Sequence, residues 1–469
     1  MHSCLLLLAL PTTMAAAAAR TEKPRLMWLP PLVVALLLLS GALLEADAAA
    51  AAAGGTGTST TSGRRRSRLL VASQSTFSLD SYGARGDGRH DDTQALGRAW
   101  EAACFSPRPA VLLVPGGKRY LLKLVALSGP CKSSVTVTVE GTLVASRDRS
   151  DWSGGGTDRR RHWIVFRQVD GLTVGGGGAV DGSGETWWKH SCKINKALPC
   201  EEAPTALSFH YCTSLRVQDL KIVDSQQMHV SIEDCTGVQL TGLSITAPGT
   251  SPNTDGIHIT RSRDVQVTNC KIKTGDDCLS IEAGTHNLHV SQVVCGPGHG
   301  ISIGSLGDDS SRAEVSGITI DTVQLYGTTN GARIKTYRGG SGYARDITFQ
   351  NMAMHGVENP IVIDQDYCDK RQATSPPCEA QGSSSSSAVE VSDVAFRNIR
   401  GTTVSKDAIK LSCSRNVPCH GITLQNISLE MQGGKGTAES TCRNARWRTS
   451  GTVLPQPCTS FIDLGHGSN

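Results

Sequence analysis

The sequence predicts an all-β protein folded as a right-handed, single-stranded parallel β-helix with a short N-terminal capping helix. Three observations lead to this fold class: an apolar pattern that repeats along the chain, a second series of short apolar strands between the repeats, and a composition of 50 glycines with only 4% aromatic residues among 469. Short strands with a period of two cannot bury themselves alone, but stacked turns of chain can. With so few large rings, we expect a core of stacked Val, Ile and Leu side chains.

Charge and cysteine content narrow the classes of function. The net charge of +4 is small and no cluster of Lys and Arg alternates with aromatic residues, so we expect no nucleic-acid partner. The 16 cysteines include no Cys-x-x-Cys pair, which argues against a zinc site and for disulfides formed in an oxidising compartment. We expect neither a cofactor nor a bound metal.

The N-terminal segment has the pattern of a secretory leader. Lys23 and Arg25 precede an apolar run at 26–44, which ends in the small-residue stretch Ala-Asp-Ala at 46–48. A basic flank, a Leu-rich centre and a small-residue exit are typical of a signal peptide, so we assign 1–48 to a signal peptide or leader. The alternative is a membrane anchor, because the run approaches the ~20 residues that cross a bilayer. Two prolines in the run favour cleavage, and we expect no stable membrane association.

Two short segments lie between the leader and the repeats. Residues 49–74 are low in complexity and polar, which predicts a linker. Folded sequence is expected to start at residue 75 and to form a single β-helix domain at 75–469. Near its beginning, residues 91–104 carry acidic residues first and then apolar residues at helical spacing, which predicts a short amphipathic helix that caps the first open coil.

From about residue 160 onward the chain repeats one pattern, apolar-x-apolar-x-x-apolar-x-apolar, often with Asn or Asp at the fifth position. The pattern starts at residues 215, 238, 265, 288, 318, 347, 394 and 422. All but one of the steps are 23–30 residues long. An antiparallel sandwich would also contain many short strands, but it would not explain a repeat of nearly constant length.

Between these repeats run shorter strands, among them IHI at 257, LSI at 279 and ISI at 301. When their apolar positions are aligned, the residues two places upstream stack on one another in consecutive coils. Those residues are Asp255, Asp277 and His299. Because adjacent coils lie ~4.8 Å apart, three ionisable side chains are expected in one column on one face. A single Asp there would be an ordinary turn residue, whereas three titratable groups in register, with Asp276 beside the middle one, indicate a site.

These residues belong to four motifs that resemble the signatures of the polygalacturonases, glycoside hydrolase family 28. The motifs are NTDGIHI at 253–259, TGDDCLSI at 274–281, CGPGHGISIGSLG at 295–307 and RIKT at 333–336. Further segments at 80–95, 187–200 and 361–368 resemble the plant branch, so the likeness covers about 75–460. The resemblance implies a pectin-lyase-like solenoid, a catalytic domain at 75–469, and pectin or homogalacturonan as the polysaccharide substrate.

The three aspartates suit glycoside hydrolysis, which needs one protonated carboxyl for the leaving oxygen and one carboxylate to activate water. Three crowded carboxyls cannot all ionise easily, so at least one pKa should be raised. The resemblance assigns the general acid to Asp276 and the binding and deprotonation of water to Asp255 and Asp277, with inversion at the anomeric carbon. Stacking places acid and base about one coil apart, closer than the ~6.5–9.5 Å usual for inverting enzymes. Asp276 and Asp277 can both reach the cleft only if a bend after Gly275 breaks the strand alternation.

The resemblance also assigns supporting roles to three residues. An imidazole at His299 would tune or orient a neighbouring carboxyl through a hydrogen bond. Tyr367 matches a tyrosine that contacts substrate near the cleaved bond. Asn253 is a substrate-binding candidate that alternatively only supports its turn.

Two basic residues are expected on the same groove. Aligning IKT at 334 with the other strand triplets places Lys335 in the column of His258, Ser280 and Ser302. Together with Arg333, it offers cationic donors, which a uronate carboxylate requires and a neutral sugar does not.

Cysteine pairing and glycosylation complete the expectations. Proximity and family likeness pair Cys278 with Cys295, Cys192 with Cys200, Cys368 with Cys378, Cys413 with Cys419, Cys442 with Cys458 and, more loosely, Cys104 with Cys131. Cys212, Cys235 and Cys270 then remain as small buried hydrophobic residues. The only glycosylation sequon is Asn426-Ile427-Ser428, whose bend position leaves both its burial and its modification open.

Within this interpretation the protein is expected to be a secreted monomer that acts in the cell wall, in pectin degradation or remodelling. Endo attack is favoured over exo attack, which stays open because the sequence does not show whether loops block one end of the groove. Two other classes also remain: a Ca²⁺-dependent pectate lyase, in which clustered aspartates hold the metal, and an inactive wall-binding relative.

Overall fold

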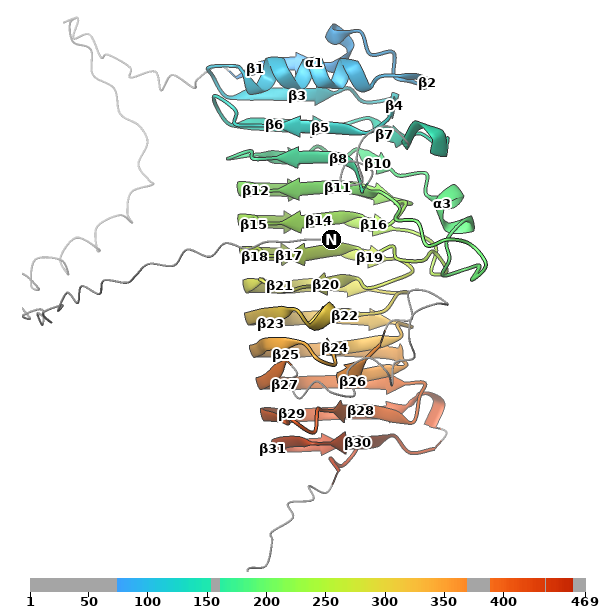
Figure 1. Ribbon diagram of the computed structural model, residues 1–469, viewed down its shortest axis with the longest axis vertical. Coiled ribbons are helices and arrows are strands. Elements are labelled where there is room, and N and C mark those ends of the chain that lie inside the picture. The colour runs from blue at the N-terminus through green and yellow to red at the C-terminus, as the bar shows by residue number, and fades with distance from the viewer. Residues whose placement is uncertain (1–73, 153–160, 369–388, 435, 459–469) are drawn as a thin grey trace, which may run out of the picture. The chain divides into compact units, whose positions relative to one another are not determined.

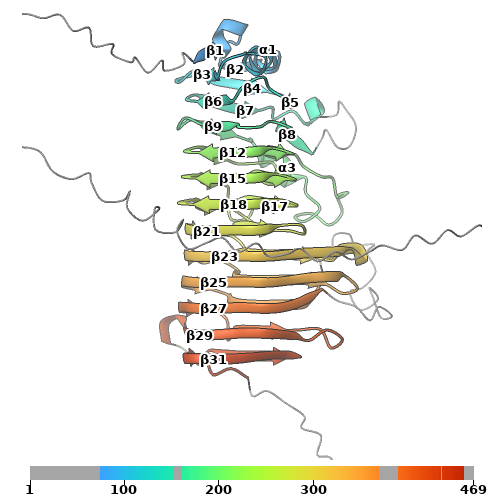
Figure 2. The ribbon, with the colours of Figure 1, turned by 90° about the vertical axis from the view of Figure 1, so that its left-hand side faces the viewer.

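The computed structural model describes residues 74–152, 161–368, 389–434 and 436–458. The predicted leader at 1–48 and, except for residue 74, the predicted linker at 49–74 lie outside the described residues. The described chain winds into a stack of coils whose strands run across the stack (Figures 1 and 2). Among these residues no helix is long and apolar enough to cross a membrane.

The strands of the described chain form two sheets in which every pairing is parallel. The 11-stranded sheet comprises β5 (Val125–Ser128), β8 (His162–Arg167), β11 (Thr205–His210), β14 (Val230–Glu233), β17 (Ile257–Thr260), β20 (Leu279–Ile281), β22 (Ile301–Leu306), β24 (Asn330–Tyr337), β26 (Asn359–Tyr367), β28 (Asp407–Ser412) and β30 (Glu439–Arg443). The 20-stranded sheet comprises β1 (Ser75–Ser78), β2 (Asp87–Asp91), β3 (Ala110–Val114), β4 (Arg119–Leu122), β6 (Val135–Val139), β7 (Thr142–Ala145), β9 (Thr173–Gly175), β10 (Ala179–Asp181), β12 (Thr213–Gln218), β13 (Lys221–Val223), β15 (Thr236–Thr241), β16 (Ser244–Thr246), β18 (Arg263–Thr268), β19 (Lys271–Lys273), β21 (His286–Cys295), β23 (Arg312–Tyr326), β25 (Ser341–Val357), β27 (Glu390–Thr403), β29 (Cys419–Met431) and β31 (Ala445–Leu454). This arrangement confirms the predicted single-stranded parallel β-helix.

The predicted repeat is also the register of the larger sheet. Leu215 of β12 pairs with Val238, Val238 with Val265, and Val265 with Leu288, each in the next coil. The register continues through Ile318 and later coils at the starts identified in the sequence. Each repeat is therefore one coil.

Helical segments are few among the described residues. The longest is α1 (Thr93–Cys104), which matches the predicted helix at 91–104; the others are α3 (Glu185–Lys189) and the 3₁₀ turns at Leu79–Tyr82, Arg149–Trp152, Asp308–Ser310 and Gln432–Gly434. Helix α1 lies over the first coils (Figure 1), where its Leu96 and Trp100 are buried and the Trp100 indole donates a hydrogen bond to the Ser128 carbonyl at 3.1 Å. The helix thus covers the end of the core, as a cap should.

The coils begin earlier than the sequence repeat suggests. Strands β1, β3, β6 and β9 already stack in register, and Leu112 pairs with Val137 and Val137 with Val174. Residues 75–145 are thus part of the same solenoid. Their bends lack the regular Asn or Asp, so the pattern is not recognisable there in the sequence.

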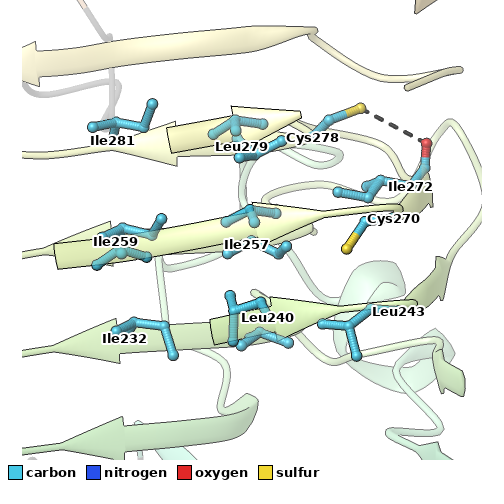
Figure 3. Close-up of a cluster of buried hydrophobic side chains, with 14 of the residues drawn as sticks. Ile232, Leu240, Leu243, Ile257, Ile259, Cys270, Ile272, Cys278, Leu279 and Ile281 are labelled. Atoms are coloured by element: carbon cyan, nitrogen blue, oxygen red, sulfur yellow. Dashed lines mark hydrogen bonds between the residues drawn. The ribbon is translucent and has the colours of Figure 1, made fainter. Parts of the chain in front are cut away.

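The core consists of inward-facing aliphatic columns. In Figure 3, Ile232, Ile259 and Ile281 lie one above another, and Ile257 lies below Leu279. All five side chains are fully buried. Such stacking buries each side chain against its equivalents in the coils above and below, and it leaves the alternate residues of each strand free to face outward.

The disulfides follow the expected pairing wherever both partners are described. The five bridges are Cys104–Cys131, Cys192–Cys200, Cys278–Cys295, Cys413–Cys419 and Cys442–Cys458. The expected pairing of Cys368 involves Cys378, which lies outside the described residues, as does Cys4. Cys212, Cys235 and Cys270 are free and buried, as predicted.

Candidate active site

Three consecutive coils bring the predicted column together on the 11-stranded sheet. Ile257 of β17 pairs with Leu279 of β20, and Leu279 pairs with Ile301 of β22. The residues two places upstream, Asp255 and Asp277, therefore lie in adjacent coils, each just before its strand. His299, the equivalent residue before β22, lies in the next coil. Backbone hydrogen bonds continue the ladder through these turns, including one of 2.9 Å from the Gly256 N–H to the Asp277 carbonyl.

A bend at Gly275 brings Asp276 and Asp277 to the same place, as the sequence required. A Cβ atom on Gly275 would lie only 1.9 Å from the Ser251 carbonyl oxygen, so no other residue fits this close approach of two backbones. After the bend, the Asp277 N–H donates a 2.9 Å hydrogen bond back to Asp276 Oδ1. Polar atoms of Asp276, Asp277 and His299 all lie within 4.8 Å of one another.

The two oxygens of Asp276 have different surroundings. Oδ1 accepts the Asp277 N–H and lies 2.9 Å from His299 Nδ1. Oδ2 has, among the described residues, only a long 3.4 Å contact with the Asn253 amide. The hydrogen bond to Asp276 raises the pKa of His299, although burial opposes this shift. Oδ2 is therefore the oxygen that remains available to a bound molecule.

Asp277 is held between two cations. Its carboxylate accepts hydrogen bonds from Ser302 Oγ at 2.8 Å, Arg333 Nη2 at 2.7 Å and Lys335 Nζ at 3.1 Å. The side chain is 2% exposed. Burial disfavours the charged form, but Arg333 and Lys335, with smaller contributions from His299 and Ser302, lower the pKa of Asp277 overall. The surroundings of Asp277 therefore favour its ionised form.

Asp255 has the opposite environment. It is buried, and burial, followed by the charges of Asp276 and Asp277, raises its pKa well above the usual range, although Ser280 and Lys335 act against the shift. The raised pKa expected among the three crowded carboxyls thus falls on Asp255, a residue assigned to the attacking water and not to the role of general acid, and burial contributes more to it than the expected repulsion between the carboxyls. The two carboxyls in adjacent coils are pushed apart in pKa, which is the pattern expected of groups that handle protons in different ways.

The predicted position of Lys335 was wrong by two residues, which is one full period of the strand alternation. Arg333, not Lys335, pairs with Ser302 and so occupies the column of His258 and Ser280, while Ile334 pairs with Ile303. A shift of two residues keeps every side chain on its original face, so Lys335 still points toward the carboxyls. It does so two residues further along the strand than Arg333.

Tyr367 closes the group on the side of the next coil. The Lys335 ammonium lies 5.1 Å from the centre of the Tyr367 ring, within the range of a cation–π contact. Tyr337 packs edge-on against the same ring at 5.3 Å between centroids. All eight residues predicted from the sequence are therefore linked by contacts to one another or lie in the same column.

Two supporting residues were missed by the sequence reasoning. Ser302 donates to Asp277 and accepts a 2.8 Å hydrogen bond from Arg333 Nε, which locks the cation and the carboxylate together. Its place in an outward-facing column was the available signal. The fully buried His229 lies 3.0 Å from the Asp255 backbone carbonyl through Nδ1, and burial lowers its pKa to about 4. No pattern in the sequence marked His229.

The residues do not suit a calcium ion, although Asp276, Asp277 and His299 have the spacing of cation ligands. Arg333 and Lys335 already occupy the Asp277 carboxylate, with side chains that are 14% and 11% exposed. A divalent cation would have to displace two nearly buried positive charges or bind beside them, and both are costly at such short range. The donor set favours an anionic or neutral ligand over a metal.

Comparisons with known proteins show which proteins this chain is similar to. The profile of Glycosyl hydrolases family 28 matches residues 104–452. The chain is 53% identical over 374 residues to a polygalacturonase of Persea americana, covering 80% of this chain and 78% of that protein. It is 47% identical over 381 residues to Polygalacturonase-2 of Solanum lycopersicum, covering 81% and 80%. Among solved structures, the polygalacturonase of Erwinia carotovora ssp. carotovora has a similar fold, with a TM-score of 0.64 at 21% identity over 84% of this chain and 100% of that one.

Proposed function

The chain belongs to the plant-type polygalacturonases of glycosyl hydrolases family 28 and is an enzyme, and from this premise we propose that it hydrolyses α-1,4-galacturonosidic bonds of de-esterified pectin with inversion. The observation that carries the proposal is the clamped Asp277 carboxylate beside two further carboxyls, Asp255 and Asp276. Such a group supplies both a base and a proton donor within one small site.

Asp276 is the proposed general acid. Its Oδ1 is occupied by the Asp277 N–H and His299, so Oδ2 is the oxygen that carries the proton toward the leaving glycosidic oxygen. Once the proton is transferred, the Asp276 carboxylate remains next to an imidazole whose raised pKa favours its positive form. His299 thereby stabilises the charge that develops on the acid, which is a positioning and electrostatic role.

Asp277 and Asp255 are proposed to hold and activate the attacking water. The opposite pKa directions of the two carboxyls suggest different roles. Asp277, kept ionised by its two cations, accepts the proton, while Asp255 orients the water. Activation requires a carboxylate at neutral pH, which only a strongly stabilised charge in so buried a position provides.

Arg333 and Lys335 are the proposed recognition elements for a galacturonate carboxylate, with Tyr367 and Asn253 as further substrate contacts. Both cations already pair with Asp277, so the substrate carboxylate would share them. This is possible because a guanidinium and an ammonium each have more than one N–H donor. The two positive charges therefore have two proposed effects: they bind the substrate carboxylate, and they keep Asp277 ionised.

The remaining features of the function rest on the sequence. We propose export through a signal peptide at 1–48, a linker at 49–74, a catalytic domain at 75–469, and action as a monomer on pectin in the cell wall. Five disulfides among the described residues support an oxidising destination. Endo attack is the proposed mode, and exo attack is the alternative.

The test is incubation of the purified protein with polygalacturonate in the presence of a chelator. The proposal expects new reducing ends, no unsaturated product absorbing in the ultraviolet, and early products of mixed size. Loss of activity with the chelator, together with unsaturated products in a parallel incubation without it, would assign a lyase. Release of single galacturonate units alone would assign exo attack, and binding without any cleavage would assign an inactive wall-binding protein.

A further inference from the structure

A hollow lies on the 20-stranded sheet, whereas Asp255 and Asp277 lie at strands of the 11-stranded sheet. Its volume is about 680 Å³, within the about 300–1,000 Å³ range of small-molecule sites. It crosses the coils of β23, β25, β27, β29 and β31. Its polar lining includes Thr322, Gln324, Asn398, Arg400, Asn426 and Ser428. The proposed function uses none of these residues.

The sequon of the chain opens into this hollow. Asn426 is exposed and stands at a bend with φ of 52°, and Ser428, the residue that completes the sequon, lines the same hollow two positions on. The sequence left open whether this asparagine is buried, and the structure shows that it is not. We propose that Asn426 carries an N-linked glycan and that this hollow holds its first sugars.

The geometry of the Asn426 amide allows the modification without loss of its hydrogen bond. Its Nδ2 donates to Asn398 Oδ1 at 3.1 Å, and Asn398 Nδ2 donates in turn to Asn351 Oδ1 at 3.0 Å, which forms a ladder along the bends. On the opposite side, the Asn426 Oδ1 lies against Gly451, where a Cβ atom would be only 2.0 Å away. The amide is thus fixed with its oxygen toward the coil of β31 and its nitrogen toward the coil of β27.

A glycosylated asparagine keeps one N–H. In a planar secondary amide of trans type, that N–H points away from the oxygen, as in the backbone. Away from the oxygen is here the direction of Asn398, so the ladder bond survives, and the sugar replaces the other hydrogen. In the reaction, Nδ2 forms a bond to the anomeric carbon of an oligosaccharide carried on a lipid pyrophosphate, the sugar–phosphate bond breaks, and the lipid pyrophosphate leaves as the amide loses a proton.

The glycan is the occupant that the hollow fits best because it is tethered at the rim. Tethering gives its sugars a high effective concentration next to hydroxyl, amide and guanidinium groups that hydrogen-bond to sugar hydroxyls. A pectin chain would have to bind the same surface without a tether. The inference depends on the proposed export of the chain, but it does not depend on the catalytic roles.

The test uses the full chain secreted from a eukaryotic host, with two substitutions of the same residue. Intact mass should show one glycan on the wild type and on Ser428→Thr, which keeps the sequon, and none on Ser428→Ala, which removes it but leaves the Asn426 amide in place. An unmodified wild type that is secreted and hydrolyses polygalacturonate would overturn the inference and leave the proposed function intact. A glycosylated but inactive protein would support the inference and contradict the proposed function.

A second readout tests the hollow itself. An endoglycosidase should release the glycan at least about tenfold more slowly from the folded enzyme than from the denatured one, the rate ratio that modest protective contacts produce. Arg400→Ala, which shortens one wall, should reduce that protection without changing the glycan mass. Equal release rates from the folded and denatured wild type would show that the sugars lie outside the hollow.

Discussion

Replacing Lys335 by Gln removes one of the two cations that hold Asp277 ionised. The Lys335 ammonium lies 3.1 Å from Asp277 Oδ2, and the two side chains are 11% and 2% exposed, so solvent screens the pair little. A hydrogen bond to a charged group contributes ~1.5–3 kcal/mol. We therefore expect kcat/KM for polygalacturonate to fall roughly 10- to 150-fold.

The same change should alter the pH profile in a defined direction. The two cations lower the pKa of Asp277, and activity that needs its carboxylate is lost as the pH falls through that value. Loss of Lys335 raises the pKa, so the decline on the acid side should begin at higher pH. At 1.36 kcal/mol per pKa unit, the same energy corresponds to a displacement of about 1–2 units. Gln keeps most of the side-chain length, which separates the effect of charge from that of volume.

The assay is kcat/KM measured across the pH range by release of reducing ends. Lys410→Gln is the matched control, because Lys410 is an exposed lysine on the same face, in the column of Arg333 two coils on, and has no hydrogen bond or ion pair with Asp277. It should leave the acid limb unchanged. If Lys335→Gln also left kcat/KM and the acid limb unchanged, Lys335 would have no part in ionising the base, and the reasoning would be refuted.

Three further changes probe other parts of the account. Asp276→Asn should lower kcat by at least ~10²-fold, the lower end for general acid catalysis, with an unchanged circular dichroism spectrum; near-native kcat would place the acid elsewhere. Methyl-esterified pectin should be cleaved more slowly than the free acid, since esterification removes the charge that Arg333 and Lys335 are proposed to bind, and equal rates would contradict carboxylate recognition. Ile259→Ala, in a fully buried column, should lower the free energy of unfolding by about 2–5 kcal/mol in denaturant titration, and a loss below about 0.5 kcal/mol, on the scale of surface substitutions, would show a loosely packed core.

Much of the fold could be predicted because each coil of a solenoid contacts only its neighbours, so the repeat in the sequence is also the register of the sheet. Leu215, Val238 and Val265 follow that rule in the structure. The coils at 75–145 were harder to recognise, since their bends lack the repeated Asn or Asp. In those coils the stacking can be recognised only from the three-dimensional structure.

The sequence predicted which residues lie together at the candidate site, but it did not predict every contact between them. A pattern of period two cannot distinguish a strand from the same strand shifted by two residues, which is why Lys335 was assigned to the column of Arg333. The ladder between β22 and β24 changes register after Ile303, and no feature of composition signals that irregularity. The clamp on Asp277 by Ser302 depends on side-chain geometry across coils and on no local motif.

The most direct test of the central claim is the anomeric configuration of the first product. Nuclear magnetic resonance during digestion of polygalacturonate should show the β-anomer of the new reducing end before mutarotation, because water activated by Asp277 attacks the face opposite the leaving group that Asp276 protonates. The Asp276→Asn variant should show no such early signal at the same enzyme concentration. Appearance of the α-anomer first would mean retention, and it would contradict the account of one acid, one base and a single displacement.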